Sequence, residues 1–223
     1  MKSNLFLQVI TLLFCIVFSS SVKAETIGVA EAQSWVENRG HQLLATFAEP
    51  DIIKKYTTLD TMFVDFIDLD YVSKFVIGKY WRQMTAEQQN TYQELFKRYA
   101  LNIYKGFPLN FDAKAIKFEV IKVQNEKKNT SVKTKVSINN QNINQQAPIS
   151  DIIVDFKLDK KNNQIKIIDL KLGESSLILS YRSRFYEMIA NSDDDITWFL
   201  EDLADITDAA ERTNQQKLKQ YEY

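Results

Sequence analysis

Hydrophobic residues in the first part of the chain recur at helical spacing. Between Ala30 and Phe47 the apolar side chains fall three or four residues apart, which predicts an amphipathic helix. Pro50 then interrupts the pattern, and Asp51 suits the positive N-terminal end of a second helix, within which Asp60 is placed to cap a new turn. The apolar positions are Ala32, Trp35, Val36, Leu43, Leu44 and Phe47 in the first helix, and Ile52, Ile53, Tyr56, Leu59, Phe63 and Phe66 in the second.

A capping box marks the start of the next long helix. Thr85 is followed three residues later by Gln88, so each side chain can bond the other residue's free backbone N–H. We therefore expect a helix from Ala86 that ends before Gly106 and Pro108. It forms a sharp corner with the helical segment before it. Its apolar face consists mainly of large rings: Tyr92, Leu95, Phe96, Tyr99 and Ile103.

The hydrophobic period then changes from helical spacing to alternation. Four segments are predicted as strands, and short polar connections between them favour an antiparallel sheet. In the last of these segments the alternation slips at Ile167 and Ile168, which indicates a bulge or a strand buried on both faces. The predicted strands are Ile116–Val123, Ser131–Asn139, Ile149–Leu158 and Ile165–Leu172.

Helical spacing returns after Gly173. One stripe consists of Leu177, Tyr181, Phe185 and Met188, and a second helix is expected from Ile196 to Leu203, with Ser192 and Asp195 as its cap. The last residues, 211–223, are predicted to be a polar tail that is frayed or solvated. The order of helices, sheet and helices predicts an α+β fold in one domain, residues 25–210.

The N-terminus has the pattern of a secretory signal peptide. Lys2 precedes an apolar run from Leu5 to Phe18, and Val22-Lys23-Ala24 offers small residues for cleavage after Ala24. The run is short for a membrane span, which leaves an uncleaved anchor as the alternative. Cleavage after residue 24 would remove the only cysteine, Cys15, so the mature protein would have no disulfide and no thiolate site.

Composition excludes some classes of function. The formal net charge is -1 for 223 residues, and cleavage would lower it to about -3, so nothing indicates a nucleic-acid partner. The only histidine, His41, leaves no basis for a Ser-His-Asp triad or a metal site. Asp65, Asp68 and Asp70 form an acidic cluster that fits either a catalytic carboxylate pair or helix-start charges. We predict no catalytic residues, no metal and no cofactor.

The remaining feature is the quantity of large apolar side chains. The chain has 14 Phe, 10 Tyr and 3 Trp residues. Three helical regions with aromatic stripes face one sheet with an apolar side. This pattern fits a filled core, and it equally fits a core left partly open between helices and sheet. An open apolar cavity would hold acyl chains, because each buried methylene contributes about 0.8 kcal/mol.

Two motifs resemble the MlaC family of periplasmic phospholipid-binding proteins, also called toluene-tolerance or organic-solvent-tolerance proteins. The first is Ile77-Gly78-Lys79-Tyr80-Trp81-Arg82, followed by the capping box and the aromatic helix that ends at Tyr104. The second is Ser176-Leu177 followed by Tyr181-Arg182-Ser183-Arg184-Phe185. The resemblance implies an NTF2-like curved antiparallel sheet of four to five strands, packed against N- and C-terminal helices around an apolar cavity.

The resemblance also implies a function. We expect a monomeric periplasmic carrier with bound phospholipid as cargo, which maintains outer-membrane lipid asymmetry. It would exchange lipid between an outer-membrane lipoprotein–porin complex and an inner-membrane ABC transporter that bears an MCE protein. The alternatives are a periplasmic hydrolase on an NTF2-like scaffold, using Asp65 or Asp68 as base, and a chaperone-like binder of apolar polypeptide.

The implied lipid site combines helix and strand residues. Arg182 matches a family arginine and is placed either to reach a lipid phosphate or to form a structural ion pair. The family usually has glycine two residues before the serine of the Ser-Leu pair, where this chain has Glu174, so the turn at the pocket mouth and the head-group preference stay open. Family-matched lipid positions are Tyr99, Ile103, Tyr104, Val154, Phe156 and Leu177, and the pattern adds Val132, Thr134, Val136, Ile152, Ile168, Leu170 and Ser175.

Overall fold

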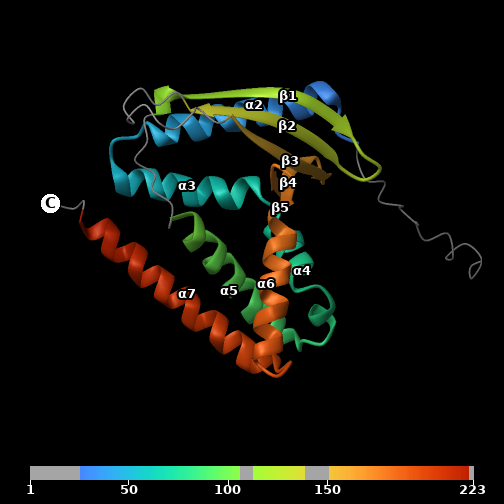
Figure 1. Cartoon of the computed structure of the whole chain (residues 1–223), viewed down its shortest axis with the longest axis vertical. Helices are drawn as coiled ribbons and strands as arrows, with labels where there is room; N and C mark the ends of the chain where they lie inside the picture. Colours follow the sequence, from blue (N-terminus) through green and yellow to red (C-terminus); the bar gives the residue numbers. More distant parts are fainter. Residues whose placement is uncertain (1–25, 106–112, 139–150, 221–223) are drawn as a thin grey trace, which may run out of the picture.

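The computed structural model describes residues 26–105, 113–138 and 151–220. The predicted signal peptide and its cleavage site lie outside these ranges, as do Gly106, Pro108 and the end of the tail. Within them the chain forms helices α2 to α7 and a five-stranded sheet (Figure 1). The predicted α+β class and antiparallel sheet are confirmed.

The two predicted N-terminal helices are present as α2 (Val29–Phe47) and α3 (Ile52–Phe66). The Asp51 carboxylate accepts a hydrogen bond from the backbone N–H of Lys54 at 3.0 Å and caps α3. Asp60, in contrast, lies inside α3 and does not begin a new turn. Its carboxylate instead forms a salt bridge with the Lys105 ammonium at 2.8 Å. This salt bridge connects α3 to the end of α5.

Helices α4 (Leu69–Ile77) and α5 (Ala86–Lys105) meet through the short 3₁₀ helix η1 (Gly78–Arg82). The capping box is confirmed: the Thr85 N–H donates to Gln88 Oε1 at 3.0 Å, and the Gln88 N–H donates to Thr85 Oγ1 at 3.2 Å. The sharp corner before it is made at Gly78, whose φ of 54° suits glycine. A side chain there would also collide with groups of α6.

The sheet is an antiparallel meander in the order β1-β2-β3-β4-β5. The predicted irregularity at Ile167 and Ile168 is a bulge, because Leu158 pairs with Ile167 while Lys157 pairs with Asp169. This leaves Ile168 as the extra residue, and it is buried. The strands are β1 (Ile116–Asn125), preceded by the 3₁₀ turn η2 (Ala113–Ala115), β2 (Thr130–Ile138), β3 (Ile152–Lys161), β4 (Gln164–Leu172) and β5 (Ser175–Ser176).

Helix α2 lies against the sheet at β1 and β2, as Figure 1 shows. The close approach depends on Gly40, because a Cβ at that position would come within 2.7 Å of the Phe118 ring of β1. One hydrophobic cluster fills this contact. Its buried members are Ile27, Ala32, Val36, Val132 and Leu158.

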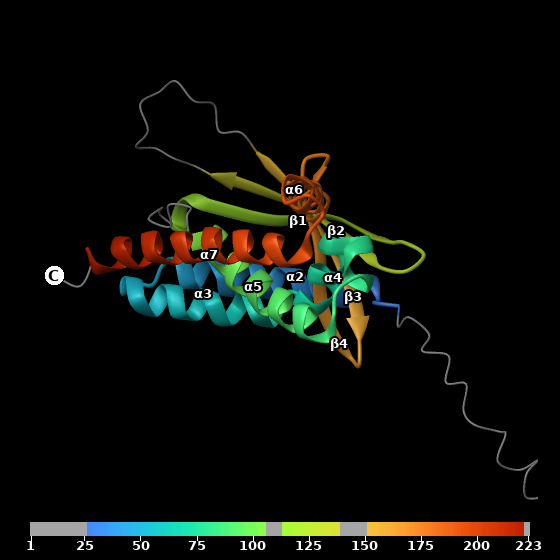
Figure 2. The same ribbon diagram turned by 90° about the horizontal axis from the view of Figure 1, so that it is seen from below.

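The helices α6 (Leu177–Asn191) and α7 (Ile196–Lys219) complete the fold. Asp195 alone is the N-cap of α7, since its carboxylate accepts from the N–H groups of Thr197 and Trp198. Ser192 instead ends α6, and its hydroxyl donates to the carbonyl oxygen of Met188. Figures 1 and 2 both place the C-terminal end of α7 at the same side of the molecule as the N-terminal end of α3.

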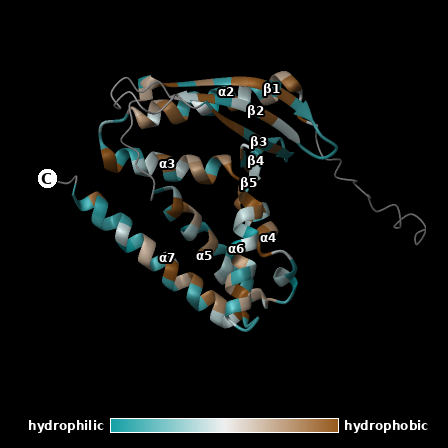
Figure 3. Ribbon diagram, in the orientation of Figure 1, coloured by the Kyte–Doolittle hydropathy of each residue, from teal (hydrophilic) through white to brown (hydrophobic). Residues whose placement is uncertain are grey.

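Residues 211–219 are not frayed, because they continue α7, but most of them are exposed, as the alternative of a solvated tail predicts. Asn214 is 6% exposed and donates to Asn102 Oδ1 of α5 at 3.0 Å. Glu211 likewise accepts hydrogen bonds from Arg98 of α5. The tail is polar in sequence because its docked side uses hydrogen bonds rather than apolar contacts. Figure 3 shows hydrophobic and hydrophilic residues interspersed along α7.

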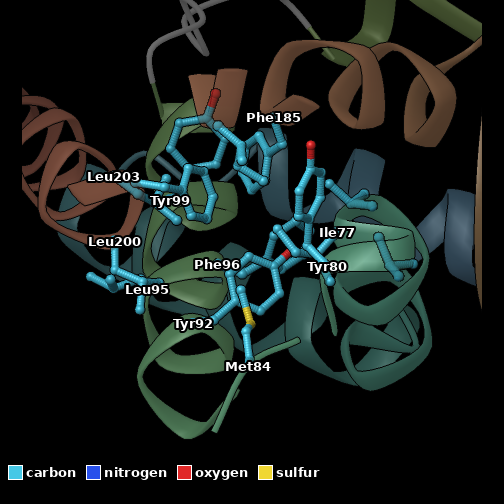
Figure 4. Close-up of a cluster of buried hydrophobic side chains, with 14 of the residues drawn as sticks. Ile77, Tyr80, Met84, Tyr92, Leu95, Phe96, Tyr99, Phe185, Leu200 and Leu203 are labelled. Carbon is cyan, nitrogen blue, oxygen red and sulfur yellow. The ribbon is translucent and has the colours of Figure 1, made fainter. Parts of the chain in front are cut away.

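A second hydrophobic cluster lies between α4, α5, α6 and α7. Tyr92, Phe96 and Tyr99 of α5 meet Phe185 of α6 there, with ring centroids 5.5–6.3 Å apart (Figure 4). The two clusters share no residue. The molecule is therefore built around a helical core and a sheet core, and the predicted lipid residues are divided between the two regions.

Candidate lipid-binding site

The predicted strand residues share one face of the sheet. Thr134 pairs with Val154, and Val136 pairs with Ile152. On the next strand, Leu170 pairs with Phe156. Because directly paired residues point to the same side of a sheet, β2, β3 and β4 present a continuous apolar row. The structure thus brings Val132, Thr134, Val136, Ile152, Val154, Phe156 and Leu170 together as expected.

This row has a covered end and an open end. Val132 is fully buried, and Phe156 packs against the same cluster as α2. At the other end, Ile152 is 41% exposed and Leu172, the partner of Val154, is 52% exposed. Large apolar side chains with that exposure on an inner sheet face are the expected surface for a ligand's hydrocarbon. The open end, not the whole row, is the candidate contact surface.

A buried carboxylate fixes the corner that leads from the sheet into α6. Asp169 is 6% exposed, and it accepts hydrogen bonds from the Ser176 hydroxyl at 2.7 Å and from the Ile178 N–H at 3.3 Å. These bonds hold β5 beside β4, where Ser175 pairs with Leu172. Leu177 follows immediately and is 40% exposed. Two predicted residues, Ser175 and Leu177, therefore lie at the open end of the sheet.

The turn between β4 and β5 has its glycine one residue before the departure at residue 174. Gly173 adopts the left-handed conformation, with φ of 59°, so the glycine that the turn needs lies one residue before Glu174. Glu174 is exposed. Its carboxylate therefore lies in solvent beside the open end of the sheet.

The predicted α5 residues lie in two environments. Tyr99 and Ile103 belong to the helical cluster, where the Tyr99 ring contacts Tyr181 of α6 at 6.1 Å between centroids. Tyr104 turns toward α3, stacks on Phe63 at 5.5 Å, and donates its hydroxyl hydrogen bond to the Asp60 carboxylate. Burial and this carboxylate together raise the pKa of Tyr104, so its hydroxyl is a protonated donor.

Arg182 is held by aromatic groups away from the sheet row. Its guanidinium carbon lies 5.0 Å from the centre of the Phe75 ring of α4, and its Nη2 donates to the Tyr186 hydroxyl at 3.2 Å. The backbone N–H of Lys79 donates to the same hydroxyl at 3.1 Å. The contacts of Arg182 therefore join α6 to the α4–η1 corner through aromatic rings, whereas the sequence left open a lipid phosphate or a structural ion pair.

Sequence reasoning missed three residues beside the predicted set. Leu172 continues the strand alternation of Leu170, and this spacing of two residues could have identified it. Tyr181 lies one helical turn after Leu177, and this spacing of four residues could have identified it. Phe63 is recognisable only from its stacking on Tyr104, which joins residues 41 positions apart in the chain. No local pattern contains that contact.

At this site the described residues form an exposed apolar surface. A hollow elsewhere, lined by residues such as Ile27, Asn129 and Leu158, has a volume of about 20 Å³ and is too small for an acyl chain. None of the predicted lipid residues lines it. The exposed side chains at this site are Ile152 and Leu172, and the apolar cavity stays a prediction.

The acidic cluster has structural partners. The Asp68 carboxylate caps α4 by accepting from the Tyr71 N–H at 2.9 Å. Asp70 pairs with Lys74 at 2.6 Å, and the hydrogen bond from this ammonium lowers the pKa of Asp70. Within the described residues, no group of His, Cys, Asp and Glu side chains could hold a metal ion.

The sequence profile of the MlaC protein family matches residues 41–205. The chain belongs to the MlaC family. The match begins within α2 and ends within α7, so it includes the open end of the sheet and both helical motifs. Comparison with curated proteins gives no match.

Among solved structures, this MlaC-family chain is similar to the phospholipid-binding protein from Ralstonia solanacearum in complex with a phospholipid. The TM-score is 0.63 at 20% sequence identity, over 80% of this chain and 98% of the other. At that identity the likeness establishes the shared fold. In the described parts of this MlaC-family chain, none of the helices combines the length and apolarity needed to cross a membrane.

Proposed function

We propose that this protein binds phospholipid in the periplasm and carries it between the outer and inner membranes. The observation that carries the proposal is the open apolar end of the sheet, with Ile152 41% and Leu172 52% exposed beside Leu177. In a chain of the MlaC family, this surface suits the acyl chains of a lipid. The phospholipid bound to the Ralstonia solanacearum protein supports the same cargo.

The proposed partners follow from the family. An outer-membrane lipoprotein–porin complex and an inner-membrane ABC transporter with an MCE protein would exchange lipid with the carrier. The carrier would travel as a monomer after cleavage of its signal peptide, and its role would be to maintain outer-membrane lipid asymmetry. Hydrocarbon burial suits this task, because it is strong in total and needs no covalent anchor.

The two alternative functions predict different cargo. A hydrolase using Asp65 or Asp68 would convert a substrate, but the Asp68 carboxylate is already bonded to the Tyr71 N–H as a helix cap. A chaperone-like protein would bind apolar polypeptide at the same open surface. Neither alternative predicts stoichiometric phospholipid in the purified protein.

The test is a solvent extract of the gently purified mature protein, analysed by mass spectrometry. We expect roughly one phospholipid per chain. Incubation with donor and acceptor vesicles should then show protein-dependent lipid transfer. Protein that is empty, stable and unable to take up phospholipid from vesicles would overturn the proposal.

A further inference from the structure

The Tyr99 hydroxyl is buried without a partner. Tyr99 is 4% exposed, and its oxygen has no hydrogen-bond partner in the structure. Buried polar groups are nearly always hydrogen-bonded, because a desolvated and unpaired hydroxyl destabilises the folded protein. An unpaired hydroxyl in this position therefore points to a partner that comes from outside the chain.

Three other tyrosines in or beside this core have hydrogen-bond partners for their hydroxyl groups. The Tyr92 hydroxyl donates to the Ser73 carbonyl oxygen at 2.9 Å. The Tyr80 hydroxyl donates to Asp194 Oδ1 at 2.9 Å, and Tyr104 donates to Asp60. A phenylalanine would fill the same ring position as Tyr99 without leaving a buried polar group unpaired. The structure therefore gives the Tyr99 hydroxyl no role within the fold.

The position of the hydroxyl relates it to the candidate site. The Tyr99 ring contacts Tyr181, which is half-buried and lies one turn after the exposed Leu177. On its own helix, the half-buried Ile103 follows Tyr99 by one turn. Tyr99 is thus at the border between the fully buried ring cluster of Figure 4 and the residues that lead to the open end of the sheet.

We propose that the Tyr99 hydroxyl donates a hydrogen bond to an ester carbonyl oxygen of the bound phospholipid. This inference rests on the proposed function and assigns a polar contact within it. The hydroxyl would hold the glycerol end of the acyl chains at a fixed depth. The half-buried Tyr181 ring is the side chain that would move to admit the ester.

An ester carbonyl suits this environment better than a phosphate. The hydroxyl is enclosed by aromatic groups, and burial raises the pKa of Tyr99, so the phenol is a neutral donor. The guanidinium carbon of Arg184 lies 5.8 Å from the centre of the Tyr99 ring. A single neutral donor satisfies a neutral carbonyl, whereas a desolvated phosphate needs several donors or a bonded cation.

The test compares Tyr99→Phe with Tyr92→Phe as the matched control. Both variants remove one buried hydroxyl from α5. The delipidated proteins are titrated with a soluble short-chain diacyl phosphatidylglycerol and with the diether lipid of the same chain length, which has no ester carbonyl. Thermal unfolding of each lipid-free protein is recorded in parallel.

We expect Tyr99→Phe to bind the diacyl lipid about 5- to 10-fold more weakly than the wild type, as loss of one hydrogen bond predicts. It should bind the diether lipid as the wild type does, and its lipid-free melting temperature should stay equal or rise. Tyr92→Phe should lower the melting temperature and leave both affinities unchanged, since its hydroxyl bonds Ser73.

Two results would overturn the assignment alone. Equal diacyl affinity for Tyr99→Phe and the wild type would show that the hydroxyl does not contact lipid. An equal loss for both lipids would assign the hydroxyl to the phosphate and not to the ester. A wild type that binds neither lipid would instead refute the proposed function itself, and the assignment with it.

Discussion

Arg98 of α5 holds Glu211 of α7 through two hydrogen bonds, from Nε at 3.0 Å and from Nη2 at 2.7 Å. The same guanidinium also reaches Asp208 at 2.6 Å. This bidentate pair docks the last two turns of α7 on α5. A segment that is polar in sequence is thereby an ordered part of the fold.

The pair should make the stability sensitive to acid. Hydrogen bonding from Arg98 lowers the pKa of Glu211 below its ordinary value of 4.5. A carboxyl with a depressed pKa in the folded state stabilises the protein above its unfolded pKa, and this contribution is lost as the pH falls through the folded pKa. Glu211→Gln should therefore lower the free energy of unfolding at pH 7 by about 0.5–1 kcal/mol. The variant should also lose less stability than the wild type as the pH falls below 4.5.

Thermal unfolding between pH 3 and pH 7 measures this effect. Glu201→Gln is the control, because it removes an exposed carboxylate from the same helix, α7. The two variants should differ in pH profile. Identical profiles for Glu211→Gln and the wild type would mean that the pair does not contribute.

Val154 and Val132 provide a matched pair for the lipid surface. Both lie on the same sheet face, but Val132 belongs to the packed cluster under α2, while Val154 pairs with the exposed Leu172. Val132→Trp should overpack and cost about 1–3 kcal/mol. Val154→Trp should fold, lose lipid, and keep much of the stability of lipid-free wild type.

Both Trp variants are compared after delipidation, since bound ligand stabilises the wild type by mass action. The measurements are thermal unfolding and lipid content after exposure to vesicles. Val154 does not line the lipid surface if Val154→Trp is as unstable as Val132→Trp, or takes up lipid as the wild type does.

Variants of Asp68 distinguish the proposed carrier function from the alternative hydrolase function. Asn is as good a helix cap as Asp, so Asp68→Asn should preserve both stability and lipid transfer. Asp68→Ala should lose about 1 kcal/mol of stability through the missing cap, with transfer retained. Asp65→Asn, at an exposed position, should change neither property. Loss of transfer in a stable, lipid-loaded Asn variant would favour the hydrolase.

Arg182 is predicted to be structural. Arg182→Met keeps the aliphatic stem but loses the contact with Phe75 and the hydrogen bond to Tyr186. We expect a loss of about 1 kcal/mol in stability and an unchanged lipid content. Arg212→Met, an exposed arginine on α7, controls for the change in net charge. Weaker lipid binding without a change in melting temperature would place Arg182 at the phosphate.

Local patterns in the sequence were sufficient for the helices and strands and for several of their ends, but not for the end of α7. The capping box at Thr85 and Gln88, the four strands and the bulge at Ile168 depend on contacts a few residues apart or on alternation along one strand. Such contacts form wherever the same short sequence adopts the same backbone, so they can be read without tertiary information. The apolar sheet face was predictable for the same reason.

Tertiary structure decided which predicted residues became core and which stayed open. Val132 and Ile152 have the same strand pattern, but α2 covers the first and leaves the second 41% exposed. The docking of Glu211 on Arg98 and the unpaired hydroxyl of Tyr99 likewise depend on helices that are far apart in sequence. Burial is a property of what packs against a residue, and the sequence around that residue does not contain it.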